Sequence, residues 1–401
     1  MTPNQPIYLD NQATTRCDPR VLTAMLPWFT EQYGNPHSAE HVMGRTAEAA
    51  VETARGHVAT LLGADPREIV FTSGATESNN IAIKGAARHP LRMGPVGENE
   101  RRRVITVATE HKCVLESAAD LKDEGFEPVF LPVAPDGLLN PEVLREALSV
   151  PTLLVSVMAV NNETGVIQDI PTLAALTKDA GALFHTDLAQ AVGKIPLDLT
   201  AWKADLASVS GHKIYGPKGV GALFVRRRPR ARIAPLFSGG GQERGLRSGT
   251  LPTPLIVGLG EACRLAAMEM AEETTQIAAL RDRLLAALRE RIPGIALNGS
   301  TRHRIAGNLN LTFPATAAAE MLKRMPDLCV STGSACSSAE IEPSYVLRAL
   351  GLTDEQAART LRIGIGRFTS PADIDHAASA LAAAHAGHAS GHGVDEYPAL
   401  R

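Results

Sequence analysis

The stretch ADLASVSGHKIYGPKGVGALFV, residues 204–225, decides the expected fold. It begins with one short apolar run and ends with another, and a turn rich in Gly and Pro joins them. Runs of this kind are typical of buried strands. Lys213 lies in the turn, where partial burial would lower the pKa of its amine and suit it to Schiff-base chemistry. Taken alone, a lysine in a loop is more often a solvated surface side chain, so the rest of the chain must decide.

Further apolar runs of strand length alternate with segments of helical periodicity along the first half of the chain. The runs are continuous, as in strands that are buried on both faces of a sheet. Alternating strands and helices predict an α/β fold with a mostly parallel sheet covered on both faces. Strands are expected at 69–72, 104–108, 128–133, 153–158 and 182–185, and helices at 39–63, 79–88, 114–124, 141–148 and 172–180.

A second, smaller unit is expected in the last third of the chain. A length of 401 residues favours two domains. A long helical pattern over residues 254–291, expected to be bent, would link them. Thr353 with Gln356 forms a capping box, and Ser370 followed by Pro371 opens the last helix. Strands are expected at 308–313, 328–330 and 362–365, and a short helix at 318–325.

Composition excludes several classes of protein. Apolar content of 44% and charged content of 21% are those of a soluble globular protein. A net charge of −3 gives no electrostatic reason to expect nucleic acid or a membrane surface as partner, and no apolar run approaches membrane-spanning length. Five cysteines without a CxxC pair argue against a disulfide framework or a structural zinc site. With no signal-peptide pattern at the start, we expect a cytoplasmic protein without a metal site.

Polar residues follow the expected strands where each one ends. Thr76, His111, Asn162 and Asp187 all fall at such positions. Because ligands of α/β sheets sit at the carboxyl ends of the strands, their convergence indicates a binding site. The segment SGAT, residues 73–76, also opens a helix whose N–H groups could bind phosphate. An ordinary glycine turn with a Thr cap explains that segment equally well.

Two of these strand-end residues fit an aromatic cofactor. A carboxylate at Asp187 is costly to bury without a partner, and a protonated pyridine nitrogen would supply one. Gln190 could donate to a phenolate oxygen of the same ring, and His111 could stack on the ring and move protons. The alternatives are an Asp that caps the following helix and a hydrogen-bonded loop histidine.

Two residues of the smaller unit are candidates as well. Cys336 lies in STGSACSS, residues 331–338, where every neighbour is small or polar, which favours an exposed and reactive thiol. The other four cysteines lie in ordinary settings and are interpreted as structural. Arg362, in an expected strand, could clamp a carboxylate or form a surface salt bridge, and the local sequence does not separate the two.

Taken together, these motifs resemble a known family. SGATES, TEH, NNETG, HTD, SGHK and SGSAC-like segments occur in one order. The chain is similar from about Ile7 to Thr369 to the cysteine desulfurases of the NifS/IscS type, pyridoxal-phosphate enzymes of the class V aminotransferase family. SAC, residues 334–336, resembles the branch with a long mobile loop. Departures at Leu188, Ala189 and Thr332 touch no reacting group, whereas the C-terminal tail does not match the partner-binding end of housekeeping members.

The resemblance implies a role for each candidate. Lys213 would anchor pyridoxal phosphate, His111 would stack on its ring, and Cys336 would carry the persulfide. Asp187 and Gln190 would hold the pyridine nitrogen and the ring hydroxyl. The remaining implied residues are phosphate ligands at Ala75, Thr76, Ser210 and His212, a phosphate contact from the other subunit at Thr250, and binders of the substrate carboxylate at Asn162 and Arg362.

The resemblance also implies the fold and the reaction. The expected fold is a type I homodimer with a seven-stranded sheet in residues 16–255 and a small α+β domain in residues 256–386, to which residues 1–15 contribute, with a disordered tail over 387–401. The enzyme would convert L-cysteine to L-alanine and pass sulfur from Cys336 to an acceptor such as an iron–sulfur scaffold protein, with transient cluster ligation by Cys336 conceivable. Open alternatives are an aminotransferase or selenocysteine lyase of the same fold, or a non-catalytic scaffold.

Overall fold

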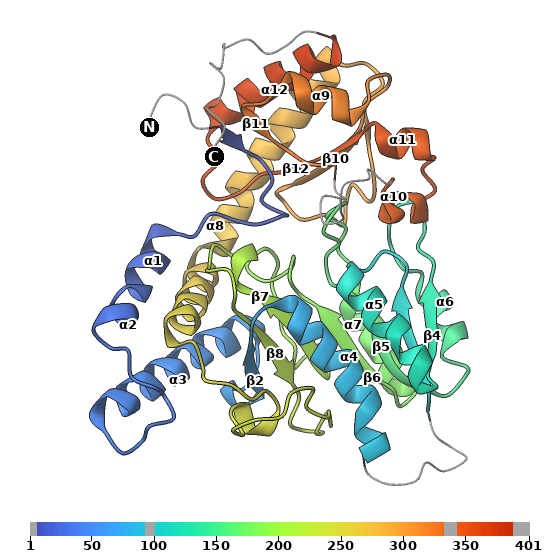
Figure 1. Ribbon diagram of the computed structural model, residues 1–401. Coiled ribbons are helices and arrows are strands. Elements are labelled where there is room, and N and C mark those ends of the chain that lie inside the picture. Colours follow the sequence, from blue (N-terminus) through green and yellow to red (C-terminus); the bar gives the residue numbers. More distant parts are fainter. Residues whose placement is uncertain (1–5, 93–100, 333–342, 388–401) are drawn as a thin grey trace, which may run out of the picture.

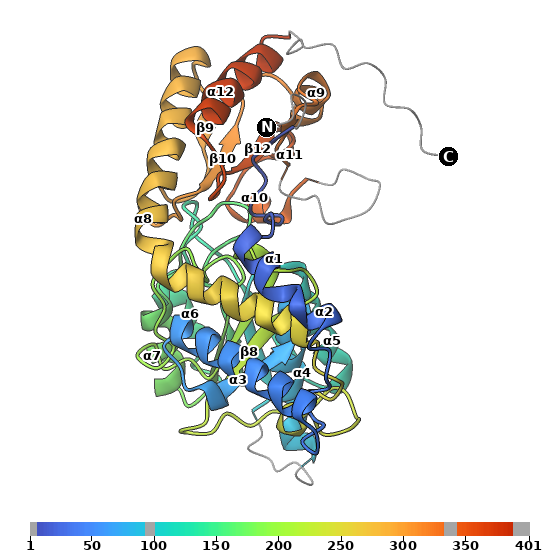
Figure 2. The same cartoon turned by 90° about the vertical axis from the view of Figure 1, so that its left-hand side faces the viewer.

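The computed structural model describes residues 6–92, 101–332 and 343–387. Figure 1 shows a larger unit built around a central sheet, a smaller unit beside it, and the long helix α8 (Thr253–Arg291) running from one to the other. Figure 2 shows the two halves of α8 pointing in different directions, so the expected bend is present. None of the helices in the described ranges combines the length and the apolar character needed to cross a membrane.

The sheet of the larger unit has seven strands in the order β2-β8-β7-β6-β5-β3-β4. Its strands are mostly parallel, and β8 is antiparallel to both of its neighbours. This confirms the expected sheet type. The strands are β2 (Ile69–Thr72), β3 (Arg103–Val107), β4 (Glu127–Leu131), β5 (Thr152–Ser156), β6 (Leu183–Asp187), β7 (Leu206–Ser210) and β8 (Gly221–Val225).

Helices cover both faces of this sheet because its strands are apolar on both sides. Alternate residues of β2 enter different cores: Phe71 packs with α3 and α8, whereas Val70 packs with α4 and α5. The first core also takes apolar residues from α1, α6 and α7. The helices of the larger unit are α1 (Pro19–Met25), α2 (Pro27–Thr30), α3 (Val42–Leu62), α4 (Ala75–Arg92), α5 (Lys112–Asp120), α6 (Pro141–Ala147) and α7 (Ile170–Asp179).

The smaller unit packs around a separate apolar core. That core includes Leu284 and Leu288 from the second half of α8, and Leu9 from the start of the chain. An antiparallel sheet in the order β12-β10-β9 forms its centre, and β1 (Ile7–Tyr8) pairs with β11 (Leu328–Cys329). Its other elements are β9 (Ala296–Leu297), β10 (Asn308–Thr312), β12 (Thr360–Gly364), α9 (Ala318–Arg324), α10 (Tyr345–Ala349), α11 (Asp354–Ala358) and α12 (Pro371–His385).

Helix ends follow the local signals of the sequence closely. Gly63 ends α3 in the left-handed conformation, with φ of 62°, as its position after an apolar pair predicts. Capping boxes open α11 at Thr353 and α12 at Ser370. The helix expected from residue 79 begins four residues earlier, at Ala75, directly after the strand-end glycine. Helices α1 and α2 were not predicted, although Asp18 caps α1 and Pro19 occupies its first turn.

Candidate active site

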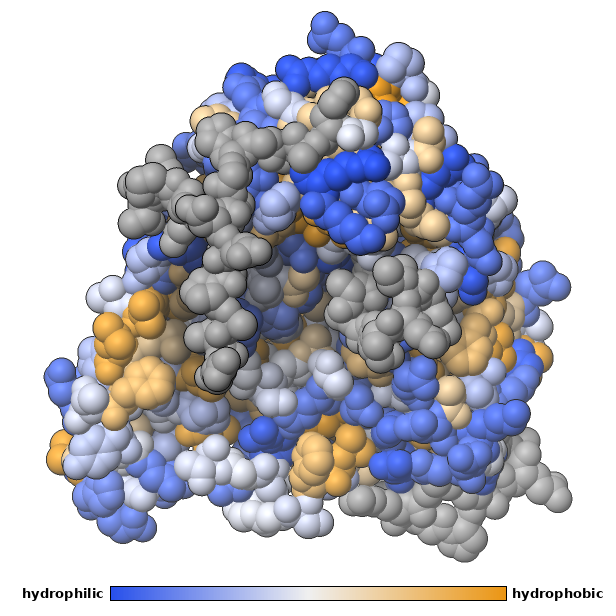
Figure 3. Space-filling model, turned by 45° about the horizontal axis from the view of Figure 1, so that its top comes forward, coloured by the Kyte–Doolittle hydropathy of each residue, from blue (hydrophilic) through white to orange (hydrophobic). Residues whose placement is uncertain are grey.

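A cavity of about 540 Å³ lies where the parallel strands of the large sheet end. This is the edge at which α/β proteins bind ligands, and the volume is typical of cofactor sites. Figure 3 shows the molecule hollowed between its larger and smaller units. Most of the predicted site residues line the cavity together: Ala75, Thr76, His111, Asn162, Asp187, Gln190, Ser210, His212 and Lys213.

Lys213 enters the cavity from the short 3-10 turn Gly211–Lys213 between β7 and β8. A Cβ at Gly211 would lie 2.9 Å from the carbonyl oxygen of Pro217, so only glycine allows the turn to fold this tightly. The lysine amine donates to the carbonyl oxygens of Gln12 and Ala13, the latter at 2.8 Å. The amine is therefore held by main-chain oxygens at the start of the chain.

His111 caps α5 at the end of the segment that follows β3. Its Nδ1 accepts a hydrogen bond from the backbone N–H of Cys113 at 3.2 Å, and the sulfur of Cys113 lies 3.0 Å from the same nitrogen. Burial lowers the pKa of His111, with a further lowering contribution from the Lys213 charge and an opposing one from Asp187. A neutral imidazole whose Nδ1 accepts carries its proton on Nε2. His111 is thus a flat, uncharged ring with one N–H to donate.

Cys113 also lines the cavity, which corrects its interpretation as a cysteine in an ordinary setting. Its sulfur accepts from Nδ2 of Asn79 at 3.2 Å. Burial raises the pKa of the Cys113 thiol to about 12. The thiolate is the nucleophile, so Cys113, which stays a thiol at neutral pH, lines the cavity without being a reacting group.

Asp187 ends β6 and is buried. One carboxylate oxygen accepts from the backbone N–H of Ala189 at 2.8 Å, and the other accepts from Nδ2 of Asn79 at 2.7 Å. These bonds hold the carboxylate in one orientation. The pairing with a residue of α4 shows that Asp187 does more than cap the turn that follows it.

Gln190 is fixed at both ends of its carboxamide. Its Nε2 donates to the carbonyl oxygen of Gln12 at 2.8 Å, and its Oε1 accepts from the amine of Lys194 at 2.7 Å. Burial lowers the pKa of Lys194 to about 7, with a further contribution from the Lys213 charge. The amide nitrogen keeps a second hydrogen that can be donated to a ligand.

The other end of the cavity is suited to an anion. Ala75 and Thr76 begin α4, where the first N–H groups of a helix have no carbonyl acceptor within the helix. Gly74, with φ of 149°, and Gly221 approach so closely that a Cβ on Gly221 would lie 2.6 Å from the Cα of Gly74. Ser210 adds a hydroxyl to this end of the cavity. Main-chain and hydroxyl donors converge here, as phosphate binding requires.

Neither of two titratable side chains near this end carries an unpaired charge: His212 is neutral, and the Glu77 carboxylate is ion-paired. Burial lowers the pKa of His212 to about 4, so its ring is uncharged at neutral pH, and its Nδ1 lies 3.0 Å from the hydroxyl of Thr14. Glu77 pairs at 2.7 Å with Arg247 of the glycine-rich loop, residues 238–250, and the pKa of Glu77 is lowered although burial opposes this. The Arg247 pairing keeps the Glu77 carboxylate from repelling an anion at the start of α4.

Arg362 lies beside the cavity rather than in its lining. Its guanidinium pairs with Asp10 at 2.7 Å and donates to the carbonyl oxygen of Asn162 at 3.1 Å. In the part of the chain that the structure describes, Nε of Arg362 and Oδ1 of Asn162 are buried and lack a hydrogen-bond partner. Buried polar atoms of this kind are costly unless a ligand or water pairs with them. The pair therefore marks a binding position for a polar group.

Of the predicted residues that the structure describes, Thr250 and Arg362 do not line this cavity. Thr250 is exposed at the end of the glycine-rich loop and does not line it. Cys336 lies outside the described residues. The described residues contain no cluster of three or more His, Cys, Asp or Glu side chains that could hold a metal ion.

The chemical groups that line the cavity match the parts of pyridoxal phosphate, and they are arranged in the corresponding order. The start of α4 with Ser210 would take the phosphate, and Lys213 would reach the carbonyl carbon. His111 offers a flat neutral ring, and the buried carboxylate of Asp187 matches a protonated ring nitrogen. The orphaned Oδ1 of Asn162 and Nε of Arg362 leave room for one more polar partner at the opposite side.

Several residues of the site were missed by sequence reasoning. Asn79, Lys194 and the carbonyl of Gln12 hold Asp187, Gln190 and Lys213 in place, yet none of them belongs to a strand-end motif. Asn79 could have been found from its position one turn after Thr76 on the helix that begins at the cavity. The carbonyl of Gln12 gives no signal in the sequence because every residue carries one.

Comparisons with known proteins agree with this geometry. The family model described as "Aminotransferase class-V" matches residues 7–377. The chain is 55% identical over 378 residues to "Cysteine desulfurase, mitochondrial" of Arthroderma benhamiae, covering 94% of this chain and 74% of that protein.

Solved structures are similar as well. One titled "NIFS-LIKE PROTEIN" superposes with a TM-score of 0.86 at 36% identity, covering 94% of this chain and 98% of that one. Another, "SspA in complex with cysteine", gives a TM-score of 0.79 at 37% identity, covering 90% and 99%. Both resemble the present chain over nearly their whole length.

Proposed function

The chain belongs to the aminotransferase class-V family, and from this premise we propose that it is a pyridoxal-phosphate-dependent cysteine desulfurase. The observation that carries the proposal is the single cavity in which Lys213, His111 and Asp187 meet beside the start of α4. The similarity to cysteine desulfurases over 94% of the chain supports the substrate and the reaction. The related structure whose title names a complex with cysteine supports L-cysteine as the molecule bound.

Pyridoxal phosphate, when bound, supplies an electron sink for the carbon atoms of an amino acid. Lys213 would bind it covalently, and its amine would then move a proton to and from the substrate's Cα. Asp187, oriented by Asn79 at 2.7 Å, would hold the positive charge of the ring nitrogen. His111 is uncharged at neutral pH because burial lowers its pKa, so its Nε2–H would donate a hydrogen bond to the bound ligand rather than transfer a proton.

The substrate carboxylate would lie between Asn162 and Arg362. The unpaired Nε of Arg362 can donate to it, and the ion pair with Asp10 keeps the guanidinium in place. A charge-assisted hydrogen bond of this kind contributes about 1.5–3 kcal/mol. Substrate binding would therefore satisfy a donor that is otherwise buried without a partner.

Sulfur would leave the substrate on Cys336. Its thiolate attacks the sulfur of L-cysteine, an S–S bond forms, and the Cβ–S bond breaks with the electron pair passing to carbon. A proton then reaches that carbon and L-alanine leaves, so that cysteine and the enzyme thiol yield alanine and an enzyme persulfide. The acceptor we propose is a sulfur-carrying or iron–sulfur scaffold protein, and Cys336 would ligate that protein's cluster transiently during docking.

A homodimer is part of the proposal. Figure 3 shows apolar residues gathered on the side where α1 and α2 lie. The exposed apolar side chains there are Leu22, Leu26, Phe29, Tyr33 and Val42. Thr250 is exposed and does not line the cavity of its own chain, so it is available to a second copy. Exposed apolar groups in such number are typical of an interface.

Replacing Cys336 tests the reaction. Cys336→Ala should keep the visible absorption band of bound pyridoxal phosphate and lose more than about 100-fold in sulfide and alanine release. Cys329→Ala, which removes a thiol of β11 a few residues earlier, is the matched control and should keep near wild-type turnover. Full sulfide release by Cys336→Ala would exclude the proposal, and transfer of the amino group to a keto acid would favour an aminotransferase instead.

A further inference from the structure

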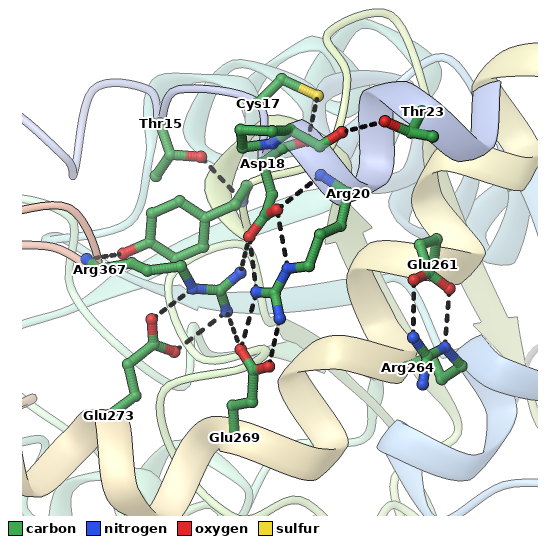
Figure 4. Close-up of polar contacts among 12 residues, drawn as sticks. Thr15, Cys17, Asp18, Arg20, Thr23, Glu261, Arg264, Glu269, Glu273 and Arg367 are labelled. Atoms are coloured by element: carbon green, nitrogen blue, oxygen red, sulfur yellow. Dashed lines mark hydrogen bonds and ion pairs between the residues drawn. The ribbon is translucent and has the colours of Figure 1, made fainter. Parts of the chain in front are cut away.

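A network of charged side chains joins the smaller unit to the larger one behind the Lys213 turn. Figure 4 shows Arg20 and Arg367 directed toward Asp18, with Glu269 and Glu273 of α8 on the other side of the two guanidiniums. Arg367 follows β12 of the smaller unit, and its side chain is only 10% exposed. It pairs with Asp18 at 2.8 Å and with Glu273 at 2.6 Å. Such a buried, multiply paired arginine holds its neighbours in one geometry.

Arg367 also contacts Tyr215, two residues after Lys213. Its guanidinium carbon lies 4.3 Å from the centre of the Tyr215 ring, and its backbone N–H donates to the tyrosine hydroxyl at 2.7 Å. A stacked guanidinium and a hydrogen bond at the far end of the ring fix both the plane and the direction of the side chain. Arg367 of the smaller unit thus fixes the position of the Tyr215 side chain, close to Lys213.

Tyr215 has a strained backbone. Its φ is +63°, in the left-handed region that bulky residues avoid. A residue stays in this conformation only when its surroundings hold it there, and such strain is concentrated at functional sites. Besides the two contacts with Arg367, the backbone N–H of Tyr215 donates to the hydroxyl of Thr15 at 2.8 Å, and its carbonyl accepts from the N–H of Asp18 at 2.9 Å.

The same N-terminal segment supports the lysine itself. The carbonyls of Gln12 and Ala13 accept from the Lys213 amine. Thr15 donates from its backbone N–H to the carbonyl of His212 at 2.9 Å. Asp18, which ends the segment, is the carboxylate that Arg367 holds. Arg367 therefore contacts both of the pieces that meet around the lysine, the turn and the segment that carries its acceptors.

We propose that Arg367 is a positioning residue for Lys213: from the smaller unit it holds Tyr215 in the left-handed conformation and thereby fixes the direction of the lysine side chain. The role of the lysine rests on the proposed function, whereas the positioning does not. Neither Arg367 nor Tyr215 lines the cavity, so both act through the turn. The Lys213 amine therefore has the right direction only when the smaller unit is packed against the larger one.

The test compares Arg367→Met with Arg283→Met. Arg283 of α8 pairs with Asp375 of α12 at 2.5 Å on the surface, and this pair has no contact with the lysine turn. In the cofactor-free protein, the rate at which a neutral acylating reagent modifies Lys213 is followed by peptide mass spectrometry, with Lys122, which is exposed and does not line the cavity, as the internal reference. In the protein with pyridoxal phosphate, the pH at which the visible band of the bound cofactor changes is measured.

Arg367→Met should raise the acylation rate of Lys213 about threefold or more relative to Lys122, because the amine leaves its carbonyl acceptors more often. The pH midpoint of the cofactor band should shift, and kcat should fall about tenfold with a smaller change in KM. Arg367→Lys should recover part of each effect, and Arg283→Met should show none. Equal behaviour of the Met variants, or an unchanged Lys213 rate in Arg367→Met, would overturn the proposal.

Tyr215 provides an independent check if Arg367→Met folds poorly. Glycine adopts a φ of +63° without strain, whereas alanine does not. Tyr215→Gly should therefore keep the Lys213 rate closer to wild type than Tyr215→Ala, and adding Arg367→Met to Tyr215→Gly should have little further effect. Equal Lys213 rates in the Gly and Ala variants would contradict the proposal. A wild-type protein that binds no pyridoxal phosphate would refute the proposed function, while the acylation rates would still decide this inference.

Discussion

The floor of the cavity and its wall are built in different ways. The floor consists of His111, Asp187 and their neighbours on the large sheet, and each takes a backbone partner two residues away in sequence. What we call the wall is the N-terminal segment Asp10–Ala13, of which Ala13 lines the cavity, together with Arg362 beside it. Its contacts span 200 residues between Lys213 and Ala13 and 352 between Arg362 and Asp10. The larger unit alone organises the floor, through its sheet and through Asn79 of α4, whereas the wall exists only when the smaller unit is in place.

The largest expected effect comes from the floor. Asp187→Asn removes the negative charge that would balance a protonated ring, so kcat should fall about 10³-fold while the cofactor still binds. Steady-state kinetics measure kcat, and the visible spectrum measures cofactor binding. Asp205→Asn is the control, since Asp205 is a buried carboxylate of the same sheet that pairs with Lys178 at 2.9 Å. A similar loss of kcat per folded molecule in Asp205→Asn would show that the loss is not specific to the cavity.

The wall should respond through substrate binding. Arg362→Lys loses the planar donor set and its Nε, so KM for L-cysteine should rise about 30-fold with kcat changed only a few-fold. Initial rates over a wide range of cysteine concentrations separate the two constants. Arg348→Lys, at a surface pair with Asp354, should leave both unchanged. A fall in kcat at unchanged KM would mean that Arg362 does not bind the substrate carboxylate.

The interior beneath the floor should respond to acid. His185 on β6 lies between the hydroxyls of Ser156 and Ser208, at 2.7 and 3.0 Å, and burial lowers its pKa from 6.5 to about 3. Below pH 6.5 the unfolded imidazole binds a proton that the folded one does not, so the free energy of unfolding falls as pH decreases. This one group should contribute about 1.4 kcal/mol per pH unit. Urea unfolding of the cofactor-free protein at several pH values measures this. The free energy of unfolding should change less steeply with pH in His185→Gln than in the wild type, and equal slopes in the two proteins would refute the prediction.

The smallest effect is expected at Cys113, whose thiol lies beside His111 in the floor. The pKa of Cys113 is raised to about 12, so Cys113→Ala should keep sulfide release within about threefold of wild type. The same assay as for Cys336→Ala measures it. A loss as large as that of Cys336→Ala would assign the persulfide to Cys113 and would require a different geometry of sulfur transfer.

The floor was predictable from the sequence, and most of the wall was not. Continuous apolar runs predicted the strands, and the polar residue after each run predicted His111, Asn162 and Asp187 at one edge, because parallel strands end together. Lys213 needed that setting to be distinguished from a surface lysine. By contrast, Cys113 was interpreted as structural because its neighbours in sequence are ordinary, and only the fold places it against His111 at 3.0 Å.

Contacts between distant segments account for what the sequence could not reveal. Neither Asp10 nor Arg367 stands in a motif, and each is defined by a partner hundreds of residues away. Helices α1 and α2 were missed although a cap and a proline mark the start of α1, because their apolar residues are few and partly exposed. Tertiary packing rather than local preference stabilises such short helices.

The carbonyl of Gln12 accepts from both Lys213 and Gln190, which has a consequence for how this site can vary. A main-chain acceptor is retained under any substitution at its own position, so mutational scanning would never delete it. Substitutions at residues 12 and 13 would change activity only to the extent that they alter the backbone conformation that presents these two carbonyls. Two of the polar contacts closest to the chemistry are therefore protected against point mutation, and a survey of tolerated substitutions would underrate the segment that provides them.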